Sequence, residues 1–151
     1  MKSRVVFSHQ SDEWETPQAL FDELDAEFHF TLDCAATEAN RKCENWLGPG
    51  SPINTDALAH TPWGIFNWLN PPYSQVRAFV AKAAQEVEYG CTTVLLLPAR
   101  TDTRWWHGCV WDRPNRQCYP WASIRFLKGR LKFGGATNGA PFPSVVVVMK
   151  P

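Results

Sequence analysis

Long apolar runs are missing from this sequence of 151 residues. The longest, within residues 93–99 and 145–149, have the length of strands, whereas a membrane-spanning helix needs about 20 apolar residues. The start of the chain, Met1-Lys2-Ser3-Arg4, leads into acidic sequence and has no hydrophobic signal region. We therefore expect a cytoplasmic protein with no membrane partner.

Metal-ligand patterns are scarce as well. The five cysteines include no C-x-x-C pair, and their odd number without a signal region argues for free thiols. His107, Cys109 and Cys118 are conceivable zinc ligands. Without a C-x-x-C pair, however, we expect no metal site.

Net charge is absent too, with 15 basic and 15 acidic residues, but the charges are unevenly distributed. Residues 1–60 carry 11 acidic and 4 basic groups, and residues 100–132 carry 8 basic and 2 acidic groups. A basic segment in an otherwise acidic chain favours an anionic partner on one face. The alternative is a solvated surface strip.

Apolar and aromatic residues are plentiful. The hydrophobic share is 44%, with eight Trp and nine Phe, which excludes an intrinsically disordered chain. The length fits one compact domain. We predict an N-terminal arm over residues 1–15 and a single domain over residues 16–151.

Helical and strand patterns alternate along the chain. Thr16 and Pro17 are typical of a helix start, with Thr16 as the cap, and the apolar spacing predicts helices over residues 17–27 and 76–87. A short helix is expected within residues 100–121. Strands are predicted over residues 28–33, 65–69, 92–97, 123–127, 131–133 and 144–149. The alternation indicates an α/β domain with a mostly parallel sheet and helices on both faces.

Polar residues follow several predicted strands directly. Asp33 and Asn70 each come immediately after such a strand, and residues 98–100 follow another. In open α/β sheets, ligands bind outside the carboxyl ends of the strands. We therefore expect these residues to form one site, although Asp33 could instead cap a helix.

The sharpest motif is Asn70-Pro71-Pro72-Tyr73. Two prolines leave the loop with carbonyl acceptors and no N–H donors. The Asn70 side-chain oxygen and the Pro71 carbonyl can each accept one hydrogen of a planar amino group, which frees the nitrogen lone pair for attack. Tyr73 offers a flat face on which a base can stack. The alternative is an ordinary turn at a strand end.

With these residues in view, the sequence resembles the phage-encoded DNA N6-adenine methyltransferases of the Dam type, which use S-adenosylmethionine. The resemblance extends from Trp14 to Met149. The matching segments are Trp14-Glu15-Thr16-Pro17, Leu32-Asp33-Cys34-Ala35-Ala36, Asn54-Thr55-Asp56-Ala57-Leu58, Asn70-Pro71-Pro72-Tyr73-Ser74, Leu97-Pro98-Ala99-Arg100-Thr101-Asp102-Thr103, Trp105-Trp106-His107 and Gly129-Arg130-Leu131-Lys132-Phe133.

The resemblance implies a Rossmann-like methyltransferase fold with S-adenosylmethionine as cofactor. It implies that residues 70–73 are catalytic, and that Glu44 or Asp56 binds the cofactor ribose. The Gly-rich F-x-G-x-G loop of many amino-methyltransferases is replaced by Asp-Cys-Ala-Ala at residues 33–36. The implied cofactor-binding residues are Trp14, Thr16, Pro17, Asp33, Ala35, Asp56 and Asn70.

We accordingly predict site-specific methyl transfer to the N6 amino group of adenine in phage or prophage DNA, with evasion of host restriction as a possible role. The base would leave the duplex, stack on Tyr73 and meet the methyl donor. Contacts with DNA are predicted for Ser74, Arg100, Arg104, Trp105, Trp106, Arg130 and Lys132. Trp105 and Trp106 could instead be core or interface residues, and Arg100 and Arg130 could be salt-bridge partners.

Other functions fit the same motif. The amino acceptor could be cytosine N4 or an amide nitrogen such as that of a protein glutamine. A catalytically silent nucleic-acid-binding module of the same fold, or a dimer scaffold with surface tryptophans, would also match parts of the pattern. The oligomeric state is open.

Overall fold

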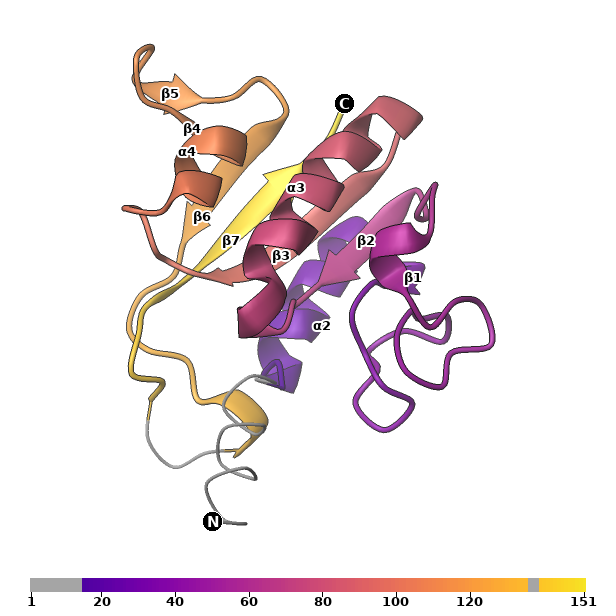
Figure 1. The fold of residues 1–151 in the computed structure, drawn as a ribbon. Coiled ribbons are helices and arrows are strands. Elements are labelled where there is room, and N and C mark those ends of the chain that lie inside the picture. The colour runs from indigo at the N-terminus through magenta and orange to yellow at the C-terminus, as the bar shows by residue number, and fades with distance from the viewer. Residues whose placement is uncertain (1–14, 136–138) are drawn as a thin grey trace, which may run out of the picture.

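The computed structural model describes residues 15–135 and 139–151, so the predicted N-terminal arm, apart from Glu15, lies outside the described residues. Helices and strands form three layers, with the sheet in the middle (Figure 1). In chain order, the elements are α2 (Gln18–Phe28), β1 (Leu32–Asp33), η1 (Ala57–Ala59), β2 (Phe66–Leu69), η2 (Tyr73–Gln75), α3 (Val76–Glu86), η3 (Val87–Tyr89), β3 (Thr92–Pro98), α4 (Arg104–Cys109), β4 (Trp111–Asp112), β5 (Gln117–Cys118), β6 (Ala122–Phe126), η4 (Phe133–Gly135) and β7 (Ser144–Met149).

The main sheet has the strand order β1-β2-β3-β7-β6. β1, β2 and β3 run parallel, whereas β7 is antiparallel to both of its neighbours, β3 and β6. The α/β class is therefore confirmed, but the sheet is mixed and the expectation of a mostly parallel sheet is wrong. Every residue of β7 is buried. A strand buried on both faces has the same apolar pattern whether its neighbours run with it or against it.

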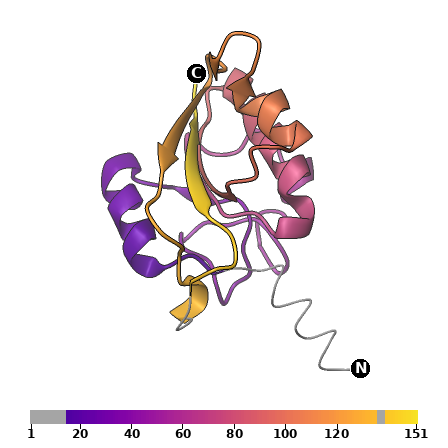
Figure 2. The same ribbon diagram turned by 90° about the vertical axis from the view of Figure 1, so that its left-hand side faces the viewer.

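Each face of the sheet is covered by a different helix, as Figure 2 shows. Leu95 and Leu97 belong to the apolar cluster that includes α3, while Val94 and Leu96 belong to the cluster that includes α2. This alternation follows from the period of two along a strand. Each fully buried aliphatic side chain stabilises the fold by about 1.5–3 kcal/mol. The expectation of helices on both faces is confirmed.

The strongly periodic segments form close to where they were predicted. α3 begins at Val76 and continues through η3 to Gly90, whose φ of 83° ends the helical segment in the left-handed conformation. β7 covers the predicted residues 144–149. Apolar periodicity was therefore sufficient for these elements.

Two predicted strands are wrong. Residues 28–33 form a strand only at Leu32–Asp33, because α2 continues to Phe28 and ends at His29, which has a φ of 55°. The Asp25 carboxylate accepts the Phe30 N–H at 2.8 Å and holds this turn. Residues 131–133 form no strand, and the 3₁₀ turn η4 begins at Phe133.

Candidate functional site

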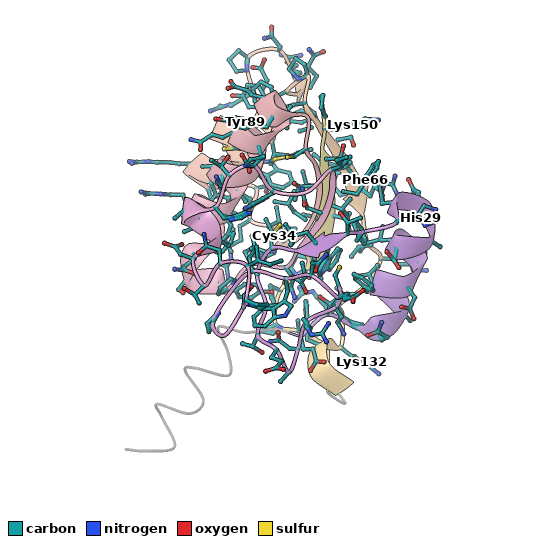
Figure 3. The ribbon with its side chains drawn as sticks, turned by 90° about the vertical axis from the view of Figure 1, so that its right-hand side faces the viewer. His29, Cys34, Phe66, Tyr89, Lys132 and Lys150 are labelled. Carbon is teal, nitrogen blue, oxygen red and sulfur yellow. The ribbon has the colours of Figure 1, made fainter. Side chains whose placement is uncertain are left out.

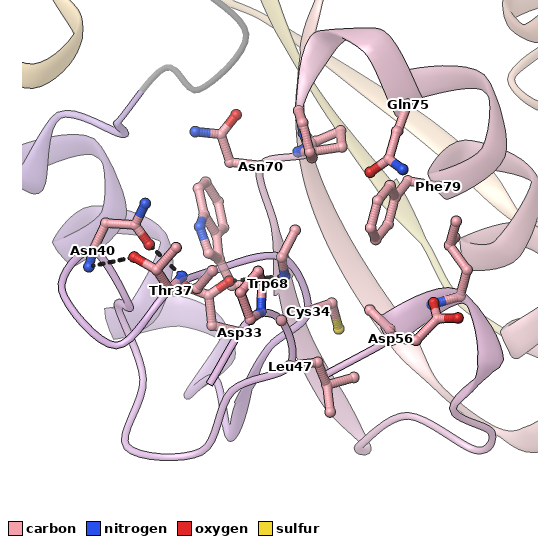
Figure 4. A pocket seen from close by; sticks show the side chains of 18 of the residues that line it. Asp33, Cys34, Thr37, Asn40, Leu47, Asp56, Trp68, Asn70, Gln75 and Phe79 are labelled. Carbon is pink, nitrogen blue, oxygen red and sulfur yellow. Dashed lines mark hydrogen bonds between the residues drawn. The ribbon is translucent and has the colours of Figure 1, made fainter. Parts of the chain in front are cut away.

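A pocket of about 310 Å³ lies at the carboxyl ends of β1 and β2 (Figure 4). Its walls come from the loop after β1, the turn around η1, the loop after β2 and the start of α3. The lining residues are 15–16, 33–37, 47–49, 55–58 and 70–72, together with Asn40, Trp68, Gln75 and Phe79. Asp33 and Asn70 meet at one edge of the sheet as predicted, whereas residues 98–100, which were expected to join them, do not line the pocket.

Asp33 ends β1 and is only 3% exposed. Its Oδ1 accepts the Ala35 N–H at 3.2 Å, and its Oδ2 accepts the Lys42 N–H at 2.9 Å. Burial raises the pKa of the Asp33 carboxyl to about 6, although both N–H groups act in the opposite direction. No helix follows, so the alternative that Asp33 caps a helix is wrong. The carboxylate instead holds the loop after β1.

Two parts of the loop after β1, at Ala36 and at Leu47–Gly48, pack against each other beside the pocket. Gly48 has a φ of 141°, and a Cβ at this position would collide with the Ala36 carbonyl oxygen. Only glycine fits here without displacement of the backbone. The Ala36 N–H in turn donates to the Leu47 carbonyl at 3.0 Å. This packing fixes Ala35 and Ala36 as a small-residue wall of the pocket.

Asn70 follows β2 and contacts the start of α2. Its Nδ2 donates a hydrogen bond to Thr16 Oγ1 at 3.0 Å, across 54 positions of sequence. Thr16 is buried, and α2 has Pro17 as its N-cap residue with no side-chain cap. The predicted capping by Thr16 is therefore wrong. Pro71 and Pro72 continue the pocket wall after Asn70.

Tyr73 begins η2 and is half-buried beside the pocket wall rather than in it. Its ring meets Phe142 edge-on, with 4.9 Å between the ring centroids, and Phe142 lies 6.1 Å from Phe133. Burial raises the pKa of the Tyr73 phenol, and the charge of Arg100 partly offsets this rise. The hydroxyl therefore stays protonated at neutral pH, and Tyr73 offers a neutral aromatic ring.

The other residues predicted to bind the cofactor differ in whether they line the pocket. Asp56 lines the pocket and caps η1, with its Oδ1 accepting the Leu58 N–H at 3.1 Å. Glu44 is exposed and does not line the pocket. Pro17 adjoins the lining residue Thr16 without lining the pocket itself. Trp14 lies outside the described residues.

Several lining residues were not predicted. Gln75 and Phe79 reach the pocket from η2 and α3, and Thr37 and Asn40 form a turn held by hydrogen bonds of 2.7 and 3.3 Å. Trp68 lines the pocket from β2. The available signal was proximity in sequence: Gln75 and Phe79 follow the Asn-Pro-Pro loop closely, so their helix begins at the same edge of the sheet.

The residues predicted to contact DNA differ in their exposure to solvent. Arg100, Arg104 and Ser74 are exposed, and Trp105 is half-buried. Trp106 is only 4% exposed and packs in the core cluster that includes α3. The prediction of a DNA contact is therefore wrong for Trp106, and its alternative as a core residue holds.

The basic segment is divided between two ends of the molecule. Lys132 lies at the lower end in Figure 3, below Cys34 of the pocket. Arg130 is also exposed, and its Nη1 donates to the Ala140 carbonyl at 3.4 Å. The β4–β5 hairpin, which carries Arg113 and Arg116, lies at the upper end in Figure 1, away from the loop that follows β1.

Ion pairs in the described parts of the chain do not involve Arg100 or Arg130. The alternative in which these two arginines are salt-bridge partners is therefore without support there. Arg125 is the arginine that pairs instead, binding Glu27 through hydrogen bonds of 2.7 and 2.6 Å. Both side chains are substantially exposed, so solvent screens this pair and it contributes little to stability.

The cysteines and histidines form no site of their own in the described residues. All five cysteines are free thiols, and no group of three or more His, Cys, Asp or Glu in residues 15–135 and 139–151 could hold a metal ion. His107 Nε2 lies 2.8 Å from the Thr101 carbonyl, which connects α4 to the loop before it. Among the described helices, none combines the length and apolar character that crossing a membrane requires.

Comparison with known proteins finds one family model and two phage proteins that match this chain. The family model described as DNA N-6-adenine-methyltransferase (Dam) matches residues 3–151. A protein of Escherichia phage T1 named DNA N-6-adenine-methyltransferase is 36% identical over 157 residues, which cover 92% of this chain and 63% of the phage protein. A protein of Haemophilus phage HP1 (strain HP1c1) with the same name is 30% identical over 143 residues, which cover 93% of this chain and 79% of that protein.

Proposed function

This chain belongs to the family of DNA N-6-adenine-methyltransferases (Dam), as the sequence resemblance predicted, and we propose that it methylates the N6 amino group of adenine in DNA. S-adenosylmethionine is the methyl donor in this proposal. Residues 16–151 form a single methyltransferase domain of Rossmann-like type, encoded by a phage or prophage. The three parallel strands and the helices on both faces of the sheet support that fold.

One observation carries the proposal: a buried carboxylate and an Asn-Pro-Pro loop line the same pocket. Asp33 is the last residue of β1 and pairs in register with Trp68 of β2, two residues before Asn70. Neighbouring parallel strands end at the same edge of a sheet, where ligands of α/β proteins bind. The site therefore combines a group that attracts a cation with a loop that accepts hydrogen bonds.

The pocket suits a cationic cofactor that carries a nucleoside. Its volume of about 310 Å³ is at the lower end of the range of small-molecule sites. Asp33 supplies a carboxylate, and Ala35 leaves room for a ligand close to the backbone. Asp56 is the better candidate for the ribose, because Glu44 lies outside the pocket. When bound, S-adenosylmethionine supplies an electrophilic methyl group on a positively charged sulfur.

Thr16 and Asn70 complete the described part of the proposed cofactor site, with Pro17 adjoining it and Trp14 predicted from sequence alone. These positions come from the start of α2 and the end of β2. Two segments 54 positions apart thus enclose the same end of the pocket.

The Asn-Pro-Pro-Tyr loop positions the amino group of the base. Asn70 Oδ1 and the Pro71 carbonyl each accept one amino hydrogen, while Pro72 adds no N–H donor that would compete. Tyr73 stacks on the base with a neutral ring. No nucleophilic side chain is required, because positioning and electrostatic stabilisation account for the acceleration.

DNA binding requires cations around this loop, because the phosphate backbone is negatively charged. The target adenine must also leave the duplex to reach the pocket. Arg100 and Arg104 follow β3, which ends at the same edge of the sheet as β1 and β2. Lys132 lies at that end of the molecule as well (Figure 3). We assign phosphate and duplex contacts to the exposed or half-buried members of the predicted set, which are Ser74, Arg100, Arg104, Trp105, Arg130 and Lys132.

The test is transfer of labelled methyl from S-adenosylmethionine to unmethylated duplex DNA, followed by nucleoside chromatography. Asn70→Ala is the test variant, and Asn115→Ala is the matched control, because Asn115 is exposed on the β4–β5 turn. We expect label in N6-methyladenine with the wild-type chain and the control, and none with Asn70→Ala. Label in N4-methylcytosine, or in protein alone, would overturn the assigned acceptor. Cofactor binding without transfer to any acceptor would overturn the enzymatic proposal.

A further inference from the structure

The hydrogen bond between Thr16 and Asn70 joins the start of α2 to the loop proposed to be catalytic. Its Nδ2–Oγ1 distance is 3.0 Å, and Thr16 is 4% exposed. Water therefore has little access to replace Thr16 as the partner of this amide. The bond is thus a fixed feature of the pocket wall.

The Thr16 hydroxyl does not cap α2, although its position before the helix suggests that it would. A threonine before a helix normally accepts an N–H of the first turn. In α2, the Pro17 carbonyl accepts the N–H groups of Leu20 and Phe21 at 3.1 and 3.2 Å, and no side chain caps the helix. The Thr16 hydroxyl is directed to Asn70 instead.

Both sides of Thr16 are anchored. On the C-terminal side, Phe21 and Leu24 bury the inner face of α2 in the core. On the N-terminal side, the Glu15 carbonyl accepts the Gly134 N–H at 3.0 Å, and the Glu15 carboxylate lies 3.8 Å from Lys42 Nζ. Because its neighbours are held, Thr16 can restrict the position of the more flexible side chain of Asn70.

The orientation matters because a side-chain amide has two different ends. The terminal torsion of asparagine is broad and roughly two-fold, so the NH₂ and the carbonyl oxygen can exchange places at little intrinsic cost. An amino group of a substrate needs the oxygen, since an NH₂ group facing it would offer a second donor. An amide whose Nδ2 donates to Thr16 directs Oδ1 away from Thr16.

We propose that Thr16 is a positioning residue, whose buried hydroxyl holds the Asn70 side chain at the pocket wall, with Nδ2 bonded to Thr16 and Oδ1 directed toward the substrate amino group. This inference rests on the proposed function. It assigns Thr16 a role in the rate of transfer, which is separate from any contact that Thr16 makes with the cofactor. Thr16→Val removes the hydroxyl at nearly constant volume, and Thr16→Ser retains it.

The experiment measures the single-turnover rate of methyl transfer with cofactor and DNA both saturating, together with the Kd for S-adenosylmethionine by calorimetry. The rate should fall in Thr16→Val by a factor between about 2 and 13, the range that corresponds to one neutral hydrogen bond. Thr16→Ser should restore the rate, and the Kd reports separately on any contact that Thr16 makes with the cofactor. Thr31→Val is the matched control, because the Thr31 hydroxyl bonds the Phe66 carbonyl at the opposite end of the parallel strands.

The alternative outcomes are distinct. A wild-type rate in Thr16→Val, or a weaker Kd with an unchanged rate, would overturn the positioning role alone. A rate in Thr16→Ser as low as in Thr16→Val would show that packing, not the hydroxyl, is responsible. Thermal unfolding of each variant identifies any rate loss that comes from misfolding. A wild-type chain that transfers no methyl group would overturn the proposed function and this inference together.

Discussion

Lowering the pH from 7 to 5 should weaken binding of S-adenosylmethionine about tenfold, through protonation of Asp33. The cofactor carries positive charge on its sulfonium and amino groups, so a charged carboxylate in the pocket favours binding. Burial raises the pKa of Asp33 to about 6 in the free protein. A bound cation favours the charged form of the carboxyl, so binding and proton release are coupled.

The magnitude follows from the pKa. With a pKa of about 6, roughly one Asp33 in eleven is charged at pH 5 and roughly ten in eleven at pH 7. If only the charged form binds the cofactor tightly, the ratio of the two Kd values is about ten. Calorimetric titrations at pH 5, 6 and 7 measure this ratio directly.

Loss of folding at pH 5 would not arise from Asp33. Because its folded-state pKa lies above the ordinary value of about 3.9, the folded chain binds a proton between roughly pH 4 and 6 that the unfolded chain does not. Asp33 therefore stabilises the fold below pH 4 by about 3 kcal/mol relative to neutral pH, and this contribution is lost as the pH rises through 6. Circular dichroism at each pH verifies that the chain stays folded.

Two variants complete the test. Asp33→Asn cannot titrate, so its Kd should be weak and nearly constant between pH 5 and 7. Asp22→Asn removes an exposed carboxylate of α2 outside the pocket and should keep the wild-type pH dependence. A flat Kd in the wild-type chain, or an unchanged pH dependence in Asp33→Asn, would refute this reasoning.

Three further outcomes are expected. Glu86→Ala should lower the free energy of unfolding by about 3 kcal/mol in urea denaturation, because Glu86 is fully buried and accepts the Trp63 N–H at 2.6 Å; a loss below 1 kcal/mol would contradict this. Trp106→Ala should cost about 3–5 kcal/mol by the same assay, while Trp106→Phe, if folded, should bind DNA like the wild type, since Trp106 is buried. Lys132→Ala should weaken DNA binding and reduce the slope of log K against log salt concentration by about 1. Arg113→Ala on the distant hairpin should have neither effect. Equal effects of the two variants would refute the assigned DNA face.

Local pattern determined much of this protein. The spacing of apolar residues was sufficient for α3 and β7, because periodicity reports which side of an element is buried. The motif at residues 70–73 and its place after a strand indicated the site. Asp33 could be placed at the same edge because successive parallel strands end together.

Only the tertiary structure decided what depends on distant partners. The direction of β7 is set by its pairing with β3 and β6, which an apolar run does not specify. Trp106 turned inward while its neighbour Trp105 stayed half-buried, because α4 packs on α3 through one face. Thr16 looked like a helix cap, but its hydroxyl bonds Asn70, since folding brings residues 54 positions apart into contact. Hydrogen bonds and pKa shifts at such a site depend on residues that are close in space but distant in sequence, and a local sequence pattern does not identify those residues.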